Sequence, residues 1–125
     1  MVQEFTSTDD FKVAFEAEAS KGSKFIVLFS GTVDADGNSW CGDCVIAKDQ
    51  IKRITDQAAG KRTVLKGIVA RAEWMGNAAH PYRQAPLSAG GVPTMCLFEG
   101  SNSMHSVGDL DSFANEDLMD MFLDE

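Results

Sequence analysis

The apolar residues of this chain form two kinds of pattern, short continuous runs and runs with the spacing of a helix. The clearest continuous run, Phe25-Ile26-Val27-Leu28-Phe29, is typical of a central strand covered on both faces. Helical spacing follows Ser7 or Thr8, either of which can cap a helix, and places Phe11 and Phe15 on one face. Together these patterns predict strands at Val2–Phe5, Lys24–Ser30, Thr63–Ala70, Thr94–Glu99 and Ser103–Val107, and helices from Thr8 to Gly22, at Asp43–Ala59 and at Ser112–Leu123.

The segments between these elements are polar or rich in glycine. Gly31–Ser39 is predicted to be a loop, and Gly100–Asn102 the turn of a hairpin. Pro81 is predicted to begin a short helix that runs to Gly90-Gly91, whereas Arg71–His80 has no clear pattern. Alternating strands and helices, followed by a hairpin and a closing helix, predict an α/β fold with a mixed central sheet and helices on both faces.

Length and charge limit the classes of protein that fit this chain. Its 125 residues suffice for one domain with one core, so residues 1–125 are expected to form a single domain. A net charge of −8 repels nucleic-acid phosphates and anionic lipids, so neither is expected as a partner. The longest apolar run is too short to span a bilayer, and Met1–Phe5 has neither a basic region nor an apolar signal core. We therefore expect a cytoplasmic protein.

The candidate chemistry lies in Trp40-Cys41-Gly42-Asp43-Cys44. Cys41 and Cys44 are three positions apart, and at a helix start this spacing brings both sulfurs to one face. There they can form a disulfide or open to a dithiol. The unpaired N–H groups of the first turn and the helix dipole favour a thiolate at Cys41 and lower its pKa. An odd count of three cysteines with one close pair fits a reducing compartment better than a secreted scaffold.

The same pair of cysteines is also compatible with half of a structural zinc site. Such a site needs two further ligands, and the candidates Cys96, His80 and His105 lie in no ligand pattern. We therefore expect no metal. Cys96, between Met95 and Leu97, is expected to be a buried small hydrophobe, and both histidines are expected at the surface.

A strand, a loop, the WCxxC motif at a helix start and Val92-Pro93-Thr94 before a hairpin resemble the thioredoxin fold over nearly the whole chain. Three features resemble the family of thioredoxin domain-containing protein 17 more closely. They are the long loop Phe29–Ser39, Asp43 followed by Cys44-Val45, and the acidic tail Met121–Glu125. The resemblance implies a cytosolic protein-disulfide reductase that takes electrons from thioredoxin reductase and NADPH, binds no cofactor, and accepts fewer protein substrates than thioredoxin.

The resemblance also implies roles for individual residues. Cys41 is the attacking cysteine, and Cys44 the resolving one. Pro93 follows a cis peptide bond and faces the disulfide across the substrate groove, where the backbone of Val92 can pair with a substrate strand. Trp40 by itself also fits the core, but a tryptophan before a CxxC motif more often shields the disulfide and offers a flat contact for the substrate.

The sequence departs from the family pattern at two positions. Gly42 stands where the close family usually has proline, so the helix start is looser and the redox potential cannot be transferred. Alignment of the central strand places Leu28 where thioredoxin has a buried acid that accepts the proton of the second cysteine. Another group or water must take that role. Asp43 is adjacent, although its charge also opposes thiolate formation.

Other residues carry weaker signals. Asp34 and Asp36 are expected to be turn residues, and Trp74 fits either the core or a groove wall. If the acidic loop lies beside the sulfurs, its bulk should exclude large folded disulfides, with a smaller contribution from its charge.

The function expected from the sequence is dithiol–disulfide exchange by Cys41 and Cys44, in a monomer that reduces protein or small-molecule disulfides in cell redox homeostasis. Three alternatives use the same fold. One is an oxidase or isomerase, the second is a thiol peroxidase, and the third is a binding module whose cysteines are idle. The tryptophan beside an intact CxxC motif argues against the last.

Overall fold

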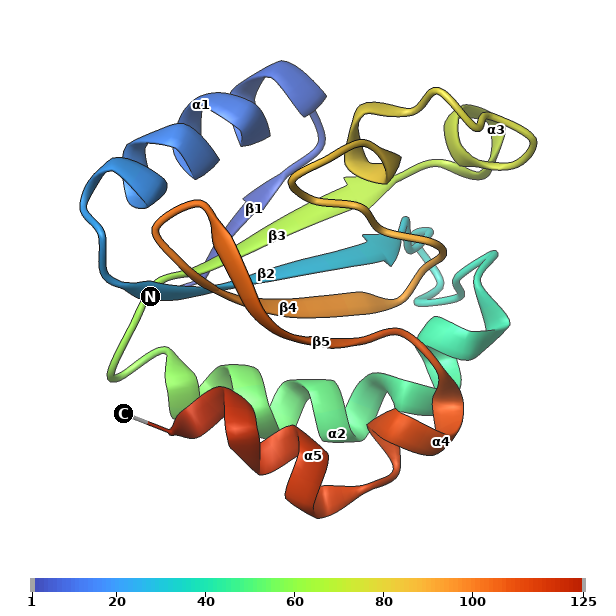
Figure 1. Cartoon of the computed structure of the whole chain (residues 1–125). Helices are drawn as coiled ribbons and strands as arrows, with labels where there is room; N and C mark the ends of the chain where they lie inside the picture. Colours follow the sequence, from blue (N-terminus) through green and yellow to red (C-terminus); the bar gives the residue numbers. More distant parts are fainter. Residues whose placement is uncertain (1, 125) are drawn as a thin grey trace.

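The computed structural model describes residues 2 to 124, and Figure 1 shows their arrangement. A five-stranded sheet in the order β1-β3-β2-β4-β5 lies between two layers of helices. The strands are β1 (Val2–Phe5), β2 (Lys24–Gly31), β3 (Val64–Val69), β4 (Thr94–Glu99) and β5 (Asn102–Val107). The helices are α1 (Thr8–Ser20), α2 (Gly42–Ala58), α3 (Arg71–Trp74), α4 (Leu110–Phe113) and α5 (Glu116–Asp120), with the 3-10 turns η1 (Pro81–Arg83) and η2 (Met121–Leu123).

The continuous apolar run forms β2 at the centre of the sheet. β2 pairs in parallel with β3 and antiparallel with β4, β1 adds in parallel beside β3, and β5 pairs antiparallel with β4. Leu28 is therefore opposite Lys66 on one side and Met95 on the other. The predicted mixed sheet is confirmed, and each predicted strand is present with its ends moved by one residue at most.

Two apolar layers fill the spaces above and below the sheet. On one face, Phe11 and Phe15 of α1 pack with the segment from Trp74 to Ala89. On the other face, α2, α4 and α5 cover the sheet (Figure 1). Tyr82, which is fully buried, stacks on Phe29 with ring centres 4.3 Å apart. Both faces of β2 are covered, which explains its continuous apolar run.

The predicted start of the first helix is confirmed. The side chain of Ser7 accepts a hydrogen bond from the N–H of Asp10 at 3.2 Å, as an N-cap residue does. Asp9 and Asp10 lie in the first turn, where the helix dipole favours negative charge. Within residues 2 to 124, no helix combines the length and the apolar character needed to cross a bilayer.

The single closing helix predicted at Ser112–Leu123 is wrong, because the first helix begins earlier and a new helix is capped at Asn115. Asp109 accepts a hydrogen bond from the N–H of Ser112 at 3.2 Å and begins α4. Asn115 accepts one from the N–H of Leu118 at 3.1 Å and begins α5. Such bonds compete with helix continuation, and Phe113, Met119 and Phe122 are nevertheless buried against the sheet.

A short helix begins at Pro81 as predicted, but the prediction that it runs to Gly90-Gly91 and the surface position predicted for His80 are wrong. The helix ends at Arg83, and Ser88, before Gly90, has a left-handed φ of 50°. His80 is 4% exposed, and its Nδ1 accepts a hydrogen bond from the N–H of Tyr82 at 3.1 Å. Burial lowers the pKa of His80, which keeps the ring in the neutral form that can accept this bond. His105 is half-buried, with Nε2 2.8 Å from the carbonyl oxygen of Leu118.

Candidate active site

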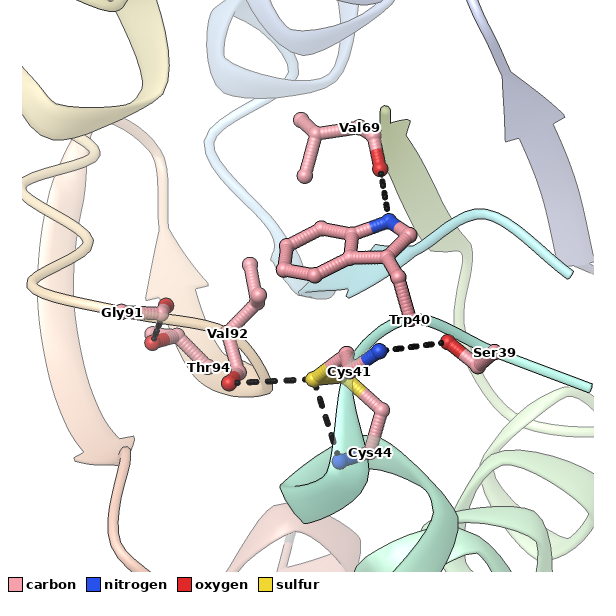
Figure 2. Close-up of a disulfide and its surroundings, with 8 residues drawn as sticks. All are labelled: Ser39, Trp40, Cys41, Cys44, Val69, Gly91, Val92 and Thr94. Carbon is pink, nitrogen blue, oxygen red and sulfur yellow. Dashed lines mark hydrogen bonds between the residues drawn. A yellow bond between two sulfur atoms is a disulfide. The ribbon is translucent and has the colours of Figure 1, made fainter. Parts of the chain in front are cut away.

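Cys41 is the N-cap residue of α2, with an extended backbone at φ −95° and ψ 99°. Its Sγ accepts a hydrogen bond from the N–H of Cys44 at 3.2 Å, the bond that a serine oxygen accepts at an ordinary N-cap (Figure 2). Its carbonyl oxygen accepts a bond from the N–H of Val45 at 3.2 Å. Cys41 and Cys44 are joined by a disulfide, with their Cα atoms 5.3 Å apart.

The local environment of the pair favours a thiolate at Cys41 once the disulfide is open. The N–H of Cys44 already points at the sulfur, and the N-terminus of a 17-residue helix lies behind it. Cys41 and Cys44 are only 5% and 8% exposed, whereas Gly42 and Asp43 between them are exposed. The two cysteines are therefore largely covered, and the two residues between them face solvent.

The Val92–Pro93 segment lies against the disulfide, as the family resemblance implied. The peptide bond between them is cis, and the carbonyl oxygen of Val92 is 3.4 Å from Cys41 Sγ (Figure 2). Thr94 donates a hydrogen bond from Oγ1 to the carbonyl oxygen of Gly91 at 2.6 Å. Pro93 is buried, while Val92 is half-buried. The fold thus brings together residues 51 positions apart in the chain.

Trp40 covers the disulfide from the side of β3. Its indole Nε1–H donates a hydrogen bond to the carbonyl oxygen of Val69 at 3.2 Å, at the end of that strand (Figure 2). A Cβ on Gly31 would lie 2.9 Å from both the Trp40 ring and the Cβ of Cys41, so only glycine fits there. The Oγ of Ser39 accepts a hydrogen bond from the N–H of Cys41 at 3.1 Å.

Sequence reasoning missed the roles of Gly31 and Ser39 at this site. Gly31 carried a signal, because a glycine that ends a buried strand often marks a close approach. The cap made by Ser39 could be inferred only from its position two residues before Cys41.

The long loop before Trp40 is a compact turn centred on Asp34. Its Oδ1 accepts hydrogen bonds from the N–H groups of Asp36 and Asn38, at 3.0 and 2.9 Å. Val33 and Ser39 form an isolated β-bridge that closes the turn. The prediction that Asp34 is a turn residue is confirmed, and both aspartates are exposed.

A groove of about 540 Å³ opens beside Cys44. Val33, Gly37 and Ser39 of the loop line it together with Cys44, so the loop lies beside the cysteines as expected. Leu28 lines it too and is buried. Two carboxylates border the groove, Glu4 at 3.5 Å from Lys66 and Asp56 at 2.6 Å from Lys52.

The remaining candidates lie outside this site. Cys96 is 2% exposed, burial raises the pKa of its thiol, and its Sγ is 3.4 Å from Ser106 Oγ. Trp74 is 2% exposed, so it belongs to the core. Residues 2 to 124 contain no cluster of three or more histidine, cysteine or acidic side chains that could hold a metal ion.

A mixed five-stranded sheet between helices, with a CxxC disulfide at a helix start, defines a thioredoxin-like protein. The family model described as "Thioredoxin domain-containing protein 17-like, thioredoxin domain" matches residues 2 to 125. The chain belongs to this family, as the sequence features indicated. The fold and the disulfide support a thiol–disulfide oxidoreductase role.

The chain is similar to several individual proteins. Thioredoxin domain-containing protein 17 of Epinephelus coioides is 32% identical over 79 residues, covering 62% of this chain and 63% of the relative. An acireductone dioxygenase of Leishmania braziliensis is 29% identical over 106 residues, or 79% of this chain, which spans only 31% of that relative's length. Oxidised thioredoxin O1 of Arabidopsis thaliana shares the fold, with a TM-score of 0.63, 19% identity and 96% of each chain covered.

Proposed function

We propose that this protein is a protein-disulfide reductase that acts through Cys41 and Cys44. The observation that carries the proposal is the position of Cys41 Sγ, which is 3.2 Å from a helix N-terminal N–H and 3.4 Å from the carbonyl oxygen of Val92. The N–H stabilises the attacking thiolate. The backbone of Val92 is available beside it to pair with the main chain of a substrate.

The exchange proceeds in two displacements. The Cys41 thiolate attacks one sulfur of the target disulfide, a bond forms between Cys41 Sγ and that sulfur, and the other target sulfur leaves as a thiolate. Cys44, after losing its proton, attacks Cys41 Sγ and displaces the second target sulfur. Two electrons pass to the target, which takes up two protons, and the Cys41–Cys44 disulfide remains.

The proton of Cys44 has a path to solvent through the groove beside it. Leu28 cannot accept a proton, and the carboxylates of Glu4 and Asp56 at the border of the groove are each engaged by a lysine. We therefore assign proton acceptance to water that enters the groove. Asp43, between the two cysteines, is exposed and tunes the site by its charge.

The catalytic cycle needs a reductase that reopens the disulfide. Family membership supports a thioredoxin reductase supplied by NADPH, with selected disulfides as substrates and the cytoplasm as the place of action. No bound organic cofactor or metal enters either displacement, because both use only sulfur atoms. Trp40 and Val92-Pro93 form the walls between which the target disulfide lies.

A reductase-coupled assay tests this proposal. With NADPH and a thioredoxin reductase, the wild-type protein should consume NADPH in the presence of a disulfide-containing peptide. Cys41→Ser should abolish turnover, because no nucleophile remains. Cys96→Ala is the matched control and should turn over as the wild type does, because Cys96 is buried away from the site. Equal turnover in Cys41→Ser and the wild type would refute the proposal.

A further inference from the structure

The guanidinium of Arg83, at the end of η1, joins two parts of the chain that precede and follow it. Nη2 donates a hydrogen bond to the carbonyl oxygen of Trp74 at 3.1 Å, and Cζ lies 3.7 Å from the centre of the Trp74 ring. Nη1 donates to the carbonyl oxygen of Gly90 at 3.1 Å. Since Trp74 is 2% exposed, the guanidinium rests on a fixed part of the core.

Gly90 begins the segment that reaches Cys41, which we name the 90–92 ledge (Gly90, Gly91 and Val92). Neither glycine has a left-handed φ, and a Cβ on either would meet no atom within 4 Å. The fold therefore does not require glycine at 90 or 91, and the ledge presents open space where side chains would stand. A backbone with two glycines is also unusually free, so hydrogen bonds must fix its position.

Two side chains supply such bonds, one at each glycine. Thr94 of β4 donates a hydrogen bond to the carbonyl oxygen of Gly91, and Arg83 of η1 donates one to the carbonyl oxygen of Gly90. The next carbonyl, that of Val92, is the one 3.4 Å from Cys41 Sγ. Arg83 and Thr94 therefore together fix the two residues that precede the group in contact with the reactive sulfur.

Given the proposed reductase activity, we propose that Arg83 is a positioning residue that sets where the 90–92 ledge stands relative to Cys41. It acts through Gly90 and determines how well a polypeptide substrate binds. The main chain of such a substrate must align with the ledge before its disulfide meets the sulfur. A small disulfide has no main chain and does not depend on the ledge. A positive charge alone is not enough for this role. Lysine has the charge but lacks the planar fork that bonds two carbonyl groups and the flat face that stacks on Trp74.

The test compares Arg83→Lys with the wild type on two substrates, a disulfide-closed peptide and hydroxyethyl disulfide. For the peptide, we expect KM to rise about fivefold, the worth of one hydrogen bond, with kcat little changed. For hydroxyethyl disulfide, kcat/KM should stay at the wild-type value, at a pH where Cys41 is fully ionised in both proteins. Arg53→Lys is the matched control, because Arg53 also bonds two groups, Gln50 and Asp120, which belong to α2 and α5.

Unchanged kinetics in Arg83→Lys, or an equal loss on both substrates, would overturn the inference. A wild-type protein inert toward both substrates would instead refute the proposed function. If Arg83→Lys does not fold, Trp74→Phe replaces it, since it keeps a buried ring and the Trp74 backbone carbonyl while weakening the stacking face. Trp74→Phe should then raise KM for the peptide and leave kcat/KM for hydroxyethyl disulfide unchanged. If it does not, the inference is overturned.

Discussion

Cys41 occupies the N-cap of α2, a position that serine, threonine, aspartate or asparagine takes in most helices. A sulfur there combines two roles, because the N–H that it accepts as a cap also stabilises it as a thiolate. The Cys41–Cys44 pair and Pro93 could be predicted from short motifs. The burial of His80 could not be predicted, because it depends on how the irregular segment around it packs, and Gly31 carried a signal only as a glycine that ends a buried strand.

Gly42 allows a prediction at the residue scale. It is the first residue of α2, a Cβ there would meet no atom within 4 Å, and Cys41 before it is extended, as a residue preceding proline must be. Gly42→Pro should therefore raise the free energy of unfolding by about 0.4–1 kcal/mol. It should also make the midpoint potential more negative, because a stiffer helix start lowers the entropy cost of closing the disulfide.

Denaturant unfolding and equilibration with glutathione buffers measure these two quantities. Gly42→Ala serves as the control. It should change both the free energy of unfolding and the midpoint potential less than Gly42→Pro does, since alanine restricts the backbone less than proline. A potential shifted toward more oxidising values in Gly42→Pro would contradict this explanation.

At the scale of elements, apolar spacing located the strands well because each is a continuous run between turns. Spacing failed for the closing helix, where Asn115 occupies a position with helical periodicity and yet caps a new helix. It also failed between Arg71 and Gly91, where hydrogen bonds donated by Arg83 and one accepted by His80 hold the chain outside two short helices. Such side-chain bonds depend on tertiary contacts that periodicity does not encode.

The loop before Trp40 carries the prediction at this scale. The bridge between Val33 and Ser39 places the ends of residues 34 to 38 side by side, so Asn-Gly can replace those five residues. The shortened protein should reduce a bulky folded disulfide faster, with little change on a small one, because the loop lies beside Cys44. Rates on both substrates measure the effect.

Charge and bulk are separated by the double variant Asp34→Asn and Asp36→Asn. Asparagine at 34 keeps the oxygen that closes the turn. The double variant should change the rate on the bulky substrate less than the shortened loop does, and this change should vanish at high salt. The reason is that surface charge pairs are worth about 1 kcal/mol or less. Equal gains on both substrates after shortening would show that selectivity lies elsewhere.

At the scale of the whole molecule, the site lies at one end of the central strands (Figure 1). Gly31 ends β2, Val69 ends β3 and Thr94 begins β4, so three neighbouring strands place Cys41, Trp40 and Val92 together. The alternation of strands and helices was enough to predict this sheet. The contact between Cys41 and the Val92 carbonyl could be predicted only from the family resemblance, because the two residues are 51 positions apart.

The central claim is that Cys41 attacks and Cys44 resolves. Trapping the intermediate tests it most directly, by intact mass and peptide mapping of reduced Cys44→Ser after mixing with excess small disulfide and acid quenching. We predict one mixed disulfide, located on Cys41, while the wild type under the same conditions ends as the internal disulfide with no adduct. An adduct on Cys96, no adduct in Cys44→Ser, or an equal and lasting adduct in the wild type would contradict the claim.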